Sequence, residues 1–415
     1  MSGKIKLCKP KFIVMKWIKY FFSFSLFLIL AIGVAFAQDK KDEANEPYTF
    51  TEVKVIPTTS VKNQNRSSTC WSFSGMAFLE SELLRMGKPA VDLSPMFVVR
   101  NIYAMKADRY VRFNGTNNFG PGGSFFDVLE AIKRFGIVPM DVYQGLNYGE
   151  ESHVHGEIDA VTKAFVDAVV KNPNRKLSTA WKKAFDGILD AYFGSLPQSF
   201  TYNGKTYTPE SFAKQLGINP DDYVVITSFS HHPFYQKFVL ELPDNWIHGE
   251  AFNVPLADFD KIIEYAIDNG YPVAWASDVS DKGFNWSKGI AIVPDFDDKE
   301  NAGSDKERWT QLSNREKEKT LYSFEKPVKE MVITQEVRQL AFDNYQTTDD
   351  HGMVLVGKAT DQLGNTYYKV KNSWGADGKY KGYFYASRAF VLYKSTNIMV
   401  HKKAVPVDLA KKLGI

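Results

Sequence analysis

The segment SSTCWSFSGMAFLESELLRMG, residues 67–87, contains the pattern from which the interpretation of the whole chain follows. Its first three residues offer hydroxyl oxygens that can cap a helix, apolar side chains then recur on one face, and Gly87 supplies a stop. The segment therefore predicts a helix that has Cys70 in its first turn.

Cysteine is used sparingly in this chain. Only Cys8 and Cys70 occur, and Cys8 lies in an N-terminal segment that we expect to be removed. No intrachain disulfide could then form, and a single thiol left in an exported protein indicates a chemical role. Without its neighbours, Cys70 would be read as a small buried core residue.

The first 37 residues are typical of a secretory signal. Six lysines accompany an apolar run at 20–37 that ends in Ala-Phe-Ala, the small-residue pattern of a cleavage site before Gln38. Met15 is an alternative start, and an N-terminal membrane anchor is the alternative interpretation of the run. We expect export to the periplasm or the cell exterior, with no stable membrane association after cleavage.

Composition indicates a globular protein. Hydrophobic residues make up 44% of the 415 residues and charged residues 24%, which is unlike a disordered chain. The net charge of +3 becomes −3 once the six lysines of the signal are removed. With no surviving basic excess, we expect no nucleic-acid partner.

Periodicity predicts an α+β fold. After a linker at 38–50, we expect one domain at 51–403, an inserted subdomain at about 140–255, an excursion at about 295–335 and a tail at 404–415. Helices are predicted at 124–135, 161–170, 179–192 and 259–269, and extended segments at 223–229, 272–279, 352–360, 366–374 and 382–390. The later strands suggest an antiparallel sheet or half-barrel, and the charged run at 299–319 a solvated face.

One of the seven histidines is set apart by its context. His351 stands at a predicted strand start within DDHGMVLVG, residues 349–357, where a rigid element could present its ring to a cleft. His153 and His155 lie in a polar loop without a recognisable ligand geometry, so we expect no metal there. The pair at 231–232 is expected in packing or at a cleft rim.

Three separated segments resemble the papain-like cysteine peptidases, family C1, in the bleomycin hydrolase or aminopeptidase C branch. They are the segment from Gln64 through STCWSF at 68–73, DHGM at 350–353 and KNSWG at 371–375. The resemblance spans about 52–403. It implies a helical half that carries the cysteine, an antiparallel half-barrel that carries histidine and asparagine, and a large, mainly helical insertion.

The resemblance also implies a role for each catalytic residue. Cys70 would be the nucleophile, His351 its base, Asn372 the group that orients the histidine, and Gln64 a donor to the oxyanion. A helix N-terminus and an adjacent imidazolium would lower the pKa of the thiol. Trp374 would shield the bond between histidine and asparagine from water.

Further residues are expected at the substrate. Gly122 and Gly123 resemble the glycine pair that hydrogen-bonds an extended substrate backbone, although a plain turn before the helix at 124 is the alternative. We also expect Trp71 and Asp349 to bind substrate. Peptides are the expected partners, with no cofactor, and a homo-oligomer, a hexamer by resemblance.

The spacing departs from that of the small papain-like enzymes. His351 follows Cys70 by 281 positions, against roughly 130 to 150 in the family pattern. The segments at 140–255 and 295–335 can hold the extra residues, and a large insertion distinguishes the bleomycin hydrolase branch.

The branch implies an aminopeptidase, in which a carboxylate in the cleft meets the substrate's amino group. Here the tail is shorter than in the branch, so the donor could be the Ile415 C-terminus or Asp349. An endopeptidase with an open cleft is the alternative. Two further alternatives are a thiol acyltransferase or amidase and an inactive exported binding protein.

Overall fold

A computed structural model describes residue 3 and residues 46–296 and 313–415. The expected signal segment and most of the charged run at 299–319 lie outside the described residues. Within the described ranges, none of the helices combines the length and the apolar character that a membrane span requires.

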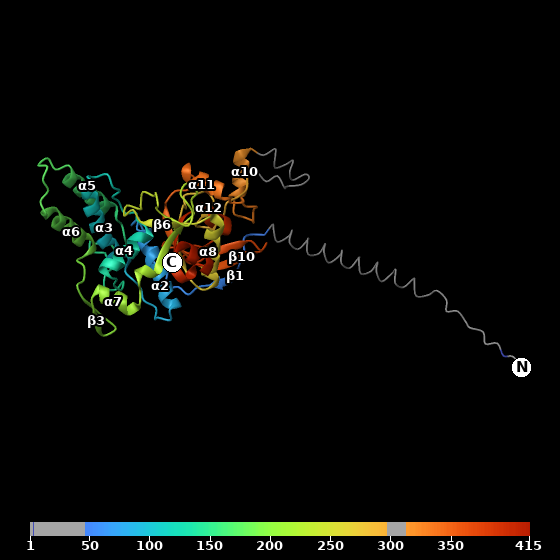
Figure 1. Cartoon of the computed structure of the whole chain (residues 1–415), viewed down its shortest axis with the longest axis horizontal. Helices are drawn as coiled ribbons and strands as arrows, with labels where there is room; N and C mark the ends of the chain where they lie inside the picture. Colours follow the sequence, from blue (N-terminus) through green and yellow to red (C-terminus); the bar gives the residue numbers. More distant parts are fainter. Residues whose placement is uncertain (1–2, 4–45, 297–312) are drawn as a thin grey trace.

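The four longest helices of the described residues, α2, α3, α5 and α6, lie in the N-terminal half of the chain. The bounds of the helices are α2 Cys70–Arg85, α3 Pro95–Arg112, α4 Phe125–Phe135, α5 Gly156–Val170, α6 Ala180–Phe193, α7 Pro209–Leu216, α8 Leu256–Asp268, α10 Asn314–Leu321, α11 Gln335–Asp343, α12 Arg388–Lys394 and α13 Val407–Leu413. Figure 1 shows α3 to α7 gathered on one side of the molecule, with α10 to α12 on the other. The fold is thus α+β with its halves set side by side.

Strands form one large sheet and a separate hairpin of β2 and β3. Their bounds are β1 Phe50–Val55, β2 Phe200–Tyr202, β3 Lys205–Tyr207, β4 Tyr223–Thr227, β5 Lys237–Val239, β6 Glu250–Asn253, β7 Val273–Ser277, β8 Phe284–Asn285, β9 Ile290–Ala291, β10 His351–Asp361, β11 Thr366–Lys371, β12 Tyr383–Ser387 and β13 Ser395–His401. The large sheet runs β5-β6-β4-β13-β7-β10-β11-β12-β9-β8, and β1 also pairs with β10.

Most pairings in the sheet are antiparallel, but β4–β6 and β12–β9 are parallel, which the expected antiparallel half-barrel did not include. Moreover, β4 pairs with β13. Part of the segment at 140–255, expected as an inserted subdomain, is therefore built into the main sheet, because its strands supply hydrogen-bond partners for the C-terminal strand.

Helix α2 is the buried centre of the fold. It packs on β10 and on α3 and α4, and side chains such as Phe73 and Phe78 are almost fully buried, each worth about 1.5–3 kcal/mol of stabilisation. A methyl group on Gly75 would lie 2.6 Å from Val128 of α4. Glycine therefore lets α4 pack closely against α2.

Several expected elements are confirmed and others differ in detail. The expected helix at 124–135 is α4, whose Ser124 N–H donates to Asp127 Oδ2 at 2.8 Å. The expected strand at 382–390 ends at Ser387, because the Ser387 hydroxyl accepts the Phe390 N–H at 3.0 Å and begins α12. Neither α3 nor β13 was expected from the pattern.

Capping of α2 differs from the expectation. Thr69 is the N-cap residue but makes no side-chain cap hydrogen bond. Its hydroxyl instead lies 2.6 Å from that of Ser67. The two hydroxyls are thus used to shape the loop before Cys70, and the helix begins at Cys70 itself.

Candidate active site

The N-terminus of α2 and the start of β10 meet at one point. Cys70 is the first residue of α2 and His351 the first of β10, and both line the same small cleft. A methyl group on Gly352 would lie 2.7 Å from Ser74 Oγ and 3.3 Å from Trp71 Cα. Glycine after the histidine therefore allows the strand to approach the helix closely enough to bring the two candidate residues together.

The ring of His351 is fixed from its far side. Its Nε2 lies 2.7 Å from Asn372 Oδ1, which also accepts the Ser373 N–H at 2.8 Å. An amide oxygen can only accept, so Nε2 carries a proton and Nδ1 is left as the basic nitrogen. The Trp374 ring covers the imidazole, with ring centroids 4.8 Å apart and planes 31° from parallel.

Gln64 is joined to the same segment. Its backbone N–H donates to the Ser373 carbonyl at 2.8 Å, and the Ser373 hydroxyl donates to Gln64 Oε1 at 2.6 Å. With the oxygen occupied, the Nε2 group of Gln64 is the end that can donate elsewhere. The structure thus ties the expected oxyanion donor to the segment after β11 that contains Asn372.

The cleft itself is narrow. Besides Cys70, His351 and Gly123, its lining includes the carboxylates Asp244 and Asp349. It encloses about 20 Å³, and roughly 10–15 Å³ is enough for a single water. The space enclosed directly beside the candidate nucleophile is therefore small.

Burial favours the neutral forms of both candidate catalytic groups. Burial raises the pKa of the Cys70 thiol to about 12, and Asp349 and Asp244 add to the rise against the Gly352 N–H. Burial also lowers the pKa of His351 to about 4, against the opposing effect of Asn372. Loss of solvent around the thiol thus opposes the lowering of its pKa that we expect from the helix N-terminus.

Two carboxylates face the nucleophile. Burial, together with the neighbouring charges of Asp244 and Asp350, raises the pKa of Asp349 to about 7. Burial raises the pKa of Asp244 too, while Lys106 opposes the rise. Sequence reasoning named Asp349 but missed Asp244, which lies in ELPDNWIHGE at 241–250, a loop without a motif.

The expected glycine pair lies beside the cleft, and side chains of other segments pack directly against both glycines. Gly122 contacts the Asp244 carboxylate through its α-carbon, and its carbonyl accepts from Lys106 Nζ. A methyl group on Gly123 would lie 2.8 Å from the Trp71 ring. The Trp71 Nε1–H donates to the carbonyl of Pro121 at 3.0 Å, so this ring helps to hold the glycine-rich segment.

The C-terminus lies elsewhere. Ile415 lines a different cavity, together with Phe126, Lys133 and Phe252. In the described part of the chain it is not among the residues that line the cleft around Cys70. Of the two carboxylate sources considered from the sequence, only Asp349 is found in the cleft.

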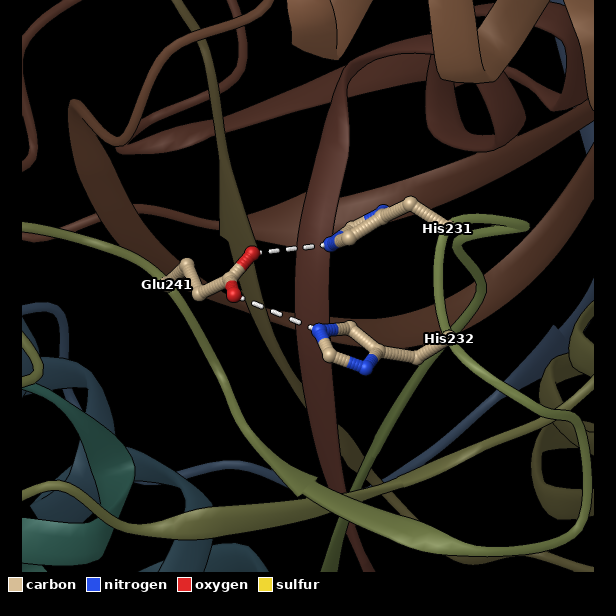
Figure 2. A group of neighbouring side chains, drawn as sticks. All are labelled: His231, His232 and Glu241. Carbon is tan, nitrogen blue, oxygen red and sulfur yellow. Dashed lines mark hydrogen bonds and ion pairs between the residues drawn. The ribbon is translucent and has the colours of Figure 1, made fainter.

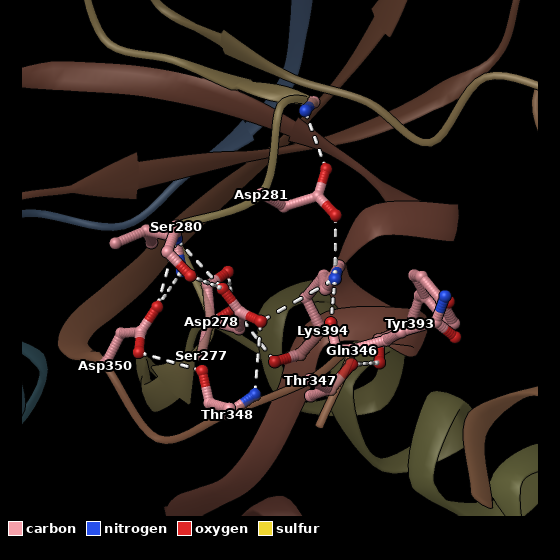
Figure 3. Close-up of polar contacts among 12 residues, drawn as sticks. Ser277, Asp278, Ser280, Asp281, Gln346, Thr347, Thr348, Asp350, Tyr393 and Lys394 are labelled. Carbon is pink, nitrogen blue, oxygen red and sulfur yellow. Dashed lines mark hydrogen bonds and ion pairs between the residues drawn. The ribbon is translucent and has the colours of Figure 1, made fainter. Parts of the chain in front are cut away.

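A polar network holds the loop before β10 (Figure 3). Asp350 accepts the Ser280 N–H and the Thr348 hydroxyl, each at 3.0 Å, while Asp278 accepts the Thr348 N–H at 3.1 Å and lies 3.6 Å from Lys394. Burial and a hydrogen bond to Asp350 raise the pKa of Asp278. The network fixes the backbone on which both Asp349 and the candidate base stand.

A second histidine cluster lies outside this cleft. His231 and His232 point their Nε2 atoms at Glu241, at 2.9 and 3.2 Å (Figure 2). Gln339 accepts the Ser230 N–H through Oε1, so its Nε2 donates to His231 Nδ1 at 3.0 Å. His231 must then carry its proton on Nε2, the atom that a metal would need unprotonated. The cluster is therefore arranged as a hydrogen-bonded network.

His153 and His155 lie behind the nucleophile's loop. Their segment pairs with Arg66, whose N–H donates to the His153 carbonyl at 3.0 Å and whose carbonyl accepts the His155 N–H at 3.1 Å. Both rings are buried, with their centroids 5.6 Å apart. They were expected in a polar loop and are instead packed inside, because this short bridge draws the loop onto the core.

Known proteins are similar to this chain in sequence and in fold. The model of the peptidase C1-like family matches residues 299–414. Aminopeptidase C of Lactobacillus delbrueckii subsp. lactis is 23% identical over 398 residues, which cover 86% of this chain and 82% of the relative. A mitochondrial cysteine proteinase 1 of Saccharomyces cerevisiae (strain YJM789) is 21% identical, with 88% of this chain and 79% of the relative covered.

Among solved structures, PepW from Lactobacillus rhamnosis HN001 superposes with a TM-score of 0.67 at 20% identity, covering 91% of this chain and 86% of that one. This likeness, with the α+β architecture, confirms the papain-like fold class expected from the sequence. Together, the family match, the relatives and the shared fold confirm the resemblance to the bleomycin hydrolase and aminopeptidase C branch that the sequence motifs indicated, and they support a cysteine peptidase.

Proposed function

We propose that this peptidase uses Cys70, His351 and Asn372 as a catalytic triad and removes single residues from the free N-termini of peptides. The observation that carries the proposal is the fixed tautomer of His351. Its Nε2 is held by Asn372 at 2.7 Å, which leaves Nδ1 as the base in the cleft that Cys70 lines.

The proposed reaction begins from a neutral pair. His351 Nδ1 takes the proton of the Cys70 thiol as the sulfur attacks the peptide carbonyl carbon. The transfer creates no net charge in the closed site. The C–N bond then breaks, the imidazolium gives its proton to the leaving amine, and a thioester joins the acyl group to the sulfur. Water, deprotonated by the same imidazole, hydrolyses the thioester and restores the thiol.

The oxyanion formed at each attack needs donors. The Cys70 backbone N–H at the start of α2 and the free Nε2 group of Gln64 are the proposed pair. Removal of one such donor typically costs about 2.7–4 kcal/mol of transition-state stabilisation. Gln64→Ala should therefore lower kcat by about a hundredfold or more without changing the fold, since its backbone contact with Ser373 is kept.

The carboxylates beside Cys70 favour an aminopeptidase over an endopeptidase. Asp244 and Asp349 line the cleft together with the candidate nucleophile, and such carboxylates favour a positively charged amino group over the neutral backbone of a longer chain. The relatives that carry the name aminopeptidase C support the same activity. Asp349 supplies a carboxylate in the cleft for the substrate's ammonium group.

The test is the cleavage pattern on a mixture of unlabelled peptides, followed by mass spectrometry. Stepwise loss of N-terminal residues is expected from the wild type, and no cleavage from Cys70→Ala, whose melting temperature should be unchanged. Labelling of Cys70 by an epoxide or iodoacetamide probe identifies the nucleophile. Activity retained in Cys70→Ala would contradict the thiol mechanism, and internal cuts at blocked peptides would favour the endopeptidase.

Export and assembly are also part of the proposal. The residues 1–37 carry the signal pattern described above, so the mature chain should begin at Gln38 and be found in the periplasm or outside the cell. N-terminal sequencing of the natural protein measures this directly. A homo-oligomer, a hexamer by resemblance, is measured by light scattering on the purified mature chain.

A further inference from the structure

We infer that Asp244 closes the cleft beyond the first substrate residue and, together with Asp349, binds the substrate's α-ammonium group. The inference rests on the proposed aminopeptidase function and assigns its specificity to an internal loop. This loop, at 240–249, connects β5 to β6, far in sequence from both the nucleophile and the C-terminus.

The first argument is the position of the Asp244 side chain. Its carboxylate lies directly against the α-carbon of Gly122, where even a methyl group would overlap it. The carbonyl of Gly122 is turned to Lys106 Nζ. An extended substrate backbone that continued past the first residue would need to bind at this glycine, and both of its sides are occupied. Only Gly123 of the pair lines the cleft.

The second argument is that the loop is fastened to the glycine-rich segment. Asn118 Nδ2 donates to the Pro243 carbonyl at 2.8 Å and lies 3.3 Å from Asp244 Oδ1. Asn117 Nδ2 donates to the Trp246 carbonyl at 3.2 Å. Residues on both sides of Asp244 are therefore held by two consecutive asparagines, so the carboxylate is fixed in place rather than lying there as a flexible surface group.

The loop is also braced internally. Asn245 Nδ2 donates to the carbonyls of Leu240 and Gly249, at 2.8 and 2.9 Å, and its Oδ1 accepts the Gly249 N–H at 2.8 Å. Asn245 is 3% exposed. One buried amide thus closes the loop into a ring and sets the direction in which its neighbour Asp244 points.

The third argument is charge. Asp244 and Asp349 both line the cleft and each lacks a cationic side chain among the residues that line it with them. Lys106 lies outside this lining and opposes the rise in the pKa of Asp244, but the hydrogen bonds of its ammonium group go to the carbonyls of Gly120 and Gly122. Two carboxylates that repel one another across a narrow space favour a bound cation, and a substrate ammonium carries three donors to satisfy them.

A purely structural role for Asp244 is the competing explanation, since its oxygen also meets Asn118. The two roles separate on substrate choice. If Asp244 only braces the loop, its replacement changes activity on free and blocked peptides alike. If it binds the ammonium group and limits the cleft, its replacement changes the ratio between them.

The experiment compares one peptide with a free N-terminus and the same peptide acetylated, with kcat and KM measured for each. Asp244→Asn keeps the shape and Asn118 contact while removing the charge. We expect it to lower kcat/KM on the free peptide about ten- to a hundredfold, chiefly through KM. Asp244→Ala also removes the obstruction, so we expect cleavage of the acetylated peptide and internal cuts to appear.

Controls are available on the same chain. Glu241→Gln alters a carboxylate of the same loop that contacts His231 and His232 outside the cleft, and should leave the ratio unchanged. A Gly-Ser extension beyond Ile415 moves the C-terminal carboxylate without removing core residues, and should also leave it unchanged. Melting temperatures show that each variant is folded, and Asp349→Asn should shift the ratio in the same direction as Asp244→Asn.

The outcomes distinguish the inference from the function on which it rests. A wild type that cuts acetylated and free peptides equally well overturns the aminopeptidase proposal itself. A wild type that prefers free N-termini, with the same preference in Asp244→Asn and Asp244→Ala, overturns only the role of Asp244. If the variant with the C-terminal extension loses the preference for free N-termini, the C-terminal carboxylate, and not Asp244, is the group that binds the substrate's amino group.

Discussion

The Nε2 atom of His351 lies 2.7 Å from Asn372 Oδ1, across the neighbouring strands β10 and β11 and beneath the ring of Trp374. This contact decides which nitrogen of the imidazole is basic. It joins two residues 21 positions apart in sequence, because Asn372 directly follows β11, which pairs antiparallel with the strand that begins at His351.

The first prediction concerns the two members of this pair. His351→Ala should lower kcat by about 10²- to 10⁴-fold, because the variant loses the imidazole that is proposed to take the proton of the thiol. Asn372→Ala should cost less, because the base is kept and only its orientation and tautomer are freed. Steady-state kinetics on a peptide with a free N-terminus measure both. Equal losses would indicate that Asn372 has a different role.

Close approach of β10 to α2 gives the second prediction. Gly352→Ala places a methyl group 2.7 Å from Ser74 Oγ, so we expect a loss of stability of about 1–3 kcal/mol from overpacking and a larger loss of activity as His351 moves away from Cys70. Denaturant unfolding and kinetics measure the two effects. The double variant with Ser74→Ala removes the nearest atom and should recover part of both; no recovery would place the cause elsewhere.

The third prediction is a dependence of stability on pH. Burial lowers the pKa of His153 to about 4 and that of His155 to about 3, below the ordinary value near 6.5. The unfolded chain therefore binds more protons than the folded chain between these values, and the free energy of unfolding falls as pH drops from about 6.5 to 4. Urea unfolding at several pH values measures this slope.

His155→Phe tests the source of that slope. The ring nitrogens of His155 have no hydrogen-bond partner among the described residues, so an apolar ring should be tolerated and the slope reduced. Replacement of the exposed His248 by Gln serves as the control and should keep it. An unchanged slope in His155→Phe would show that other groups cause the loss at low pH.

The sequence predicts the chemistry of this site better than its specificity. The motifs around Cys70, His351 and Asn372 can be recognised in a single sequence. Close packing restricts which residues can stand next to them, as it does for Gly352 after the histidine. Asp244, in contrast, stands in a loop that contains no recognisable motif, and contacts of Asn118 and Asn245 hold this loop at the cleft. Gly122 and Asp244 are 122 positions apart in the sequence, so no local sequence pattern predicts the contact between them.

The degree of burial of a residue is a second property that the sequence does not predict. A cysteine at a helix N-terminus suggested a lowered thiol pKa, but the amount of solvent around Cys70 depends on Asp244, Asp349 and the strands that close the cleft. In the same way, α3 has weakly patterned hydrophobicity because it is buried on many sides. Such features arise from tertiary packing and are invisible in the periodicity of one segment.

The last prediction concerns the pH dependence of peptide cleavage. Burial and the nearby Asp244 and Asp350 raise the pKa of Asp349 to about 7. A carboxyl group with a raised pKa is neutral below that value and charged above it, so Asp349 can pair with a substrate ammonium only as pH rises through about 7. We therefore expect kcat/KM on peptides with a free N-terminus to increase across this range, since this ratio reports on groups of the free enzyme.

Asp349→Asn separates this ionisation from that of the catalytic pair. The variant cannot ionise at this position, so the rise near pH 7 should disappear for the free peptide while the folded structure is kept. An acetylated peptide, which has no ammonium group, should show no such rise in the wild type. If the free peptide shows the same rise with wild type and Asp349→Asn, the group that titrates is not Asp349. The recognition of the ammonium group would then fall to Asp244 alone.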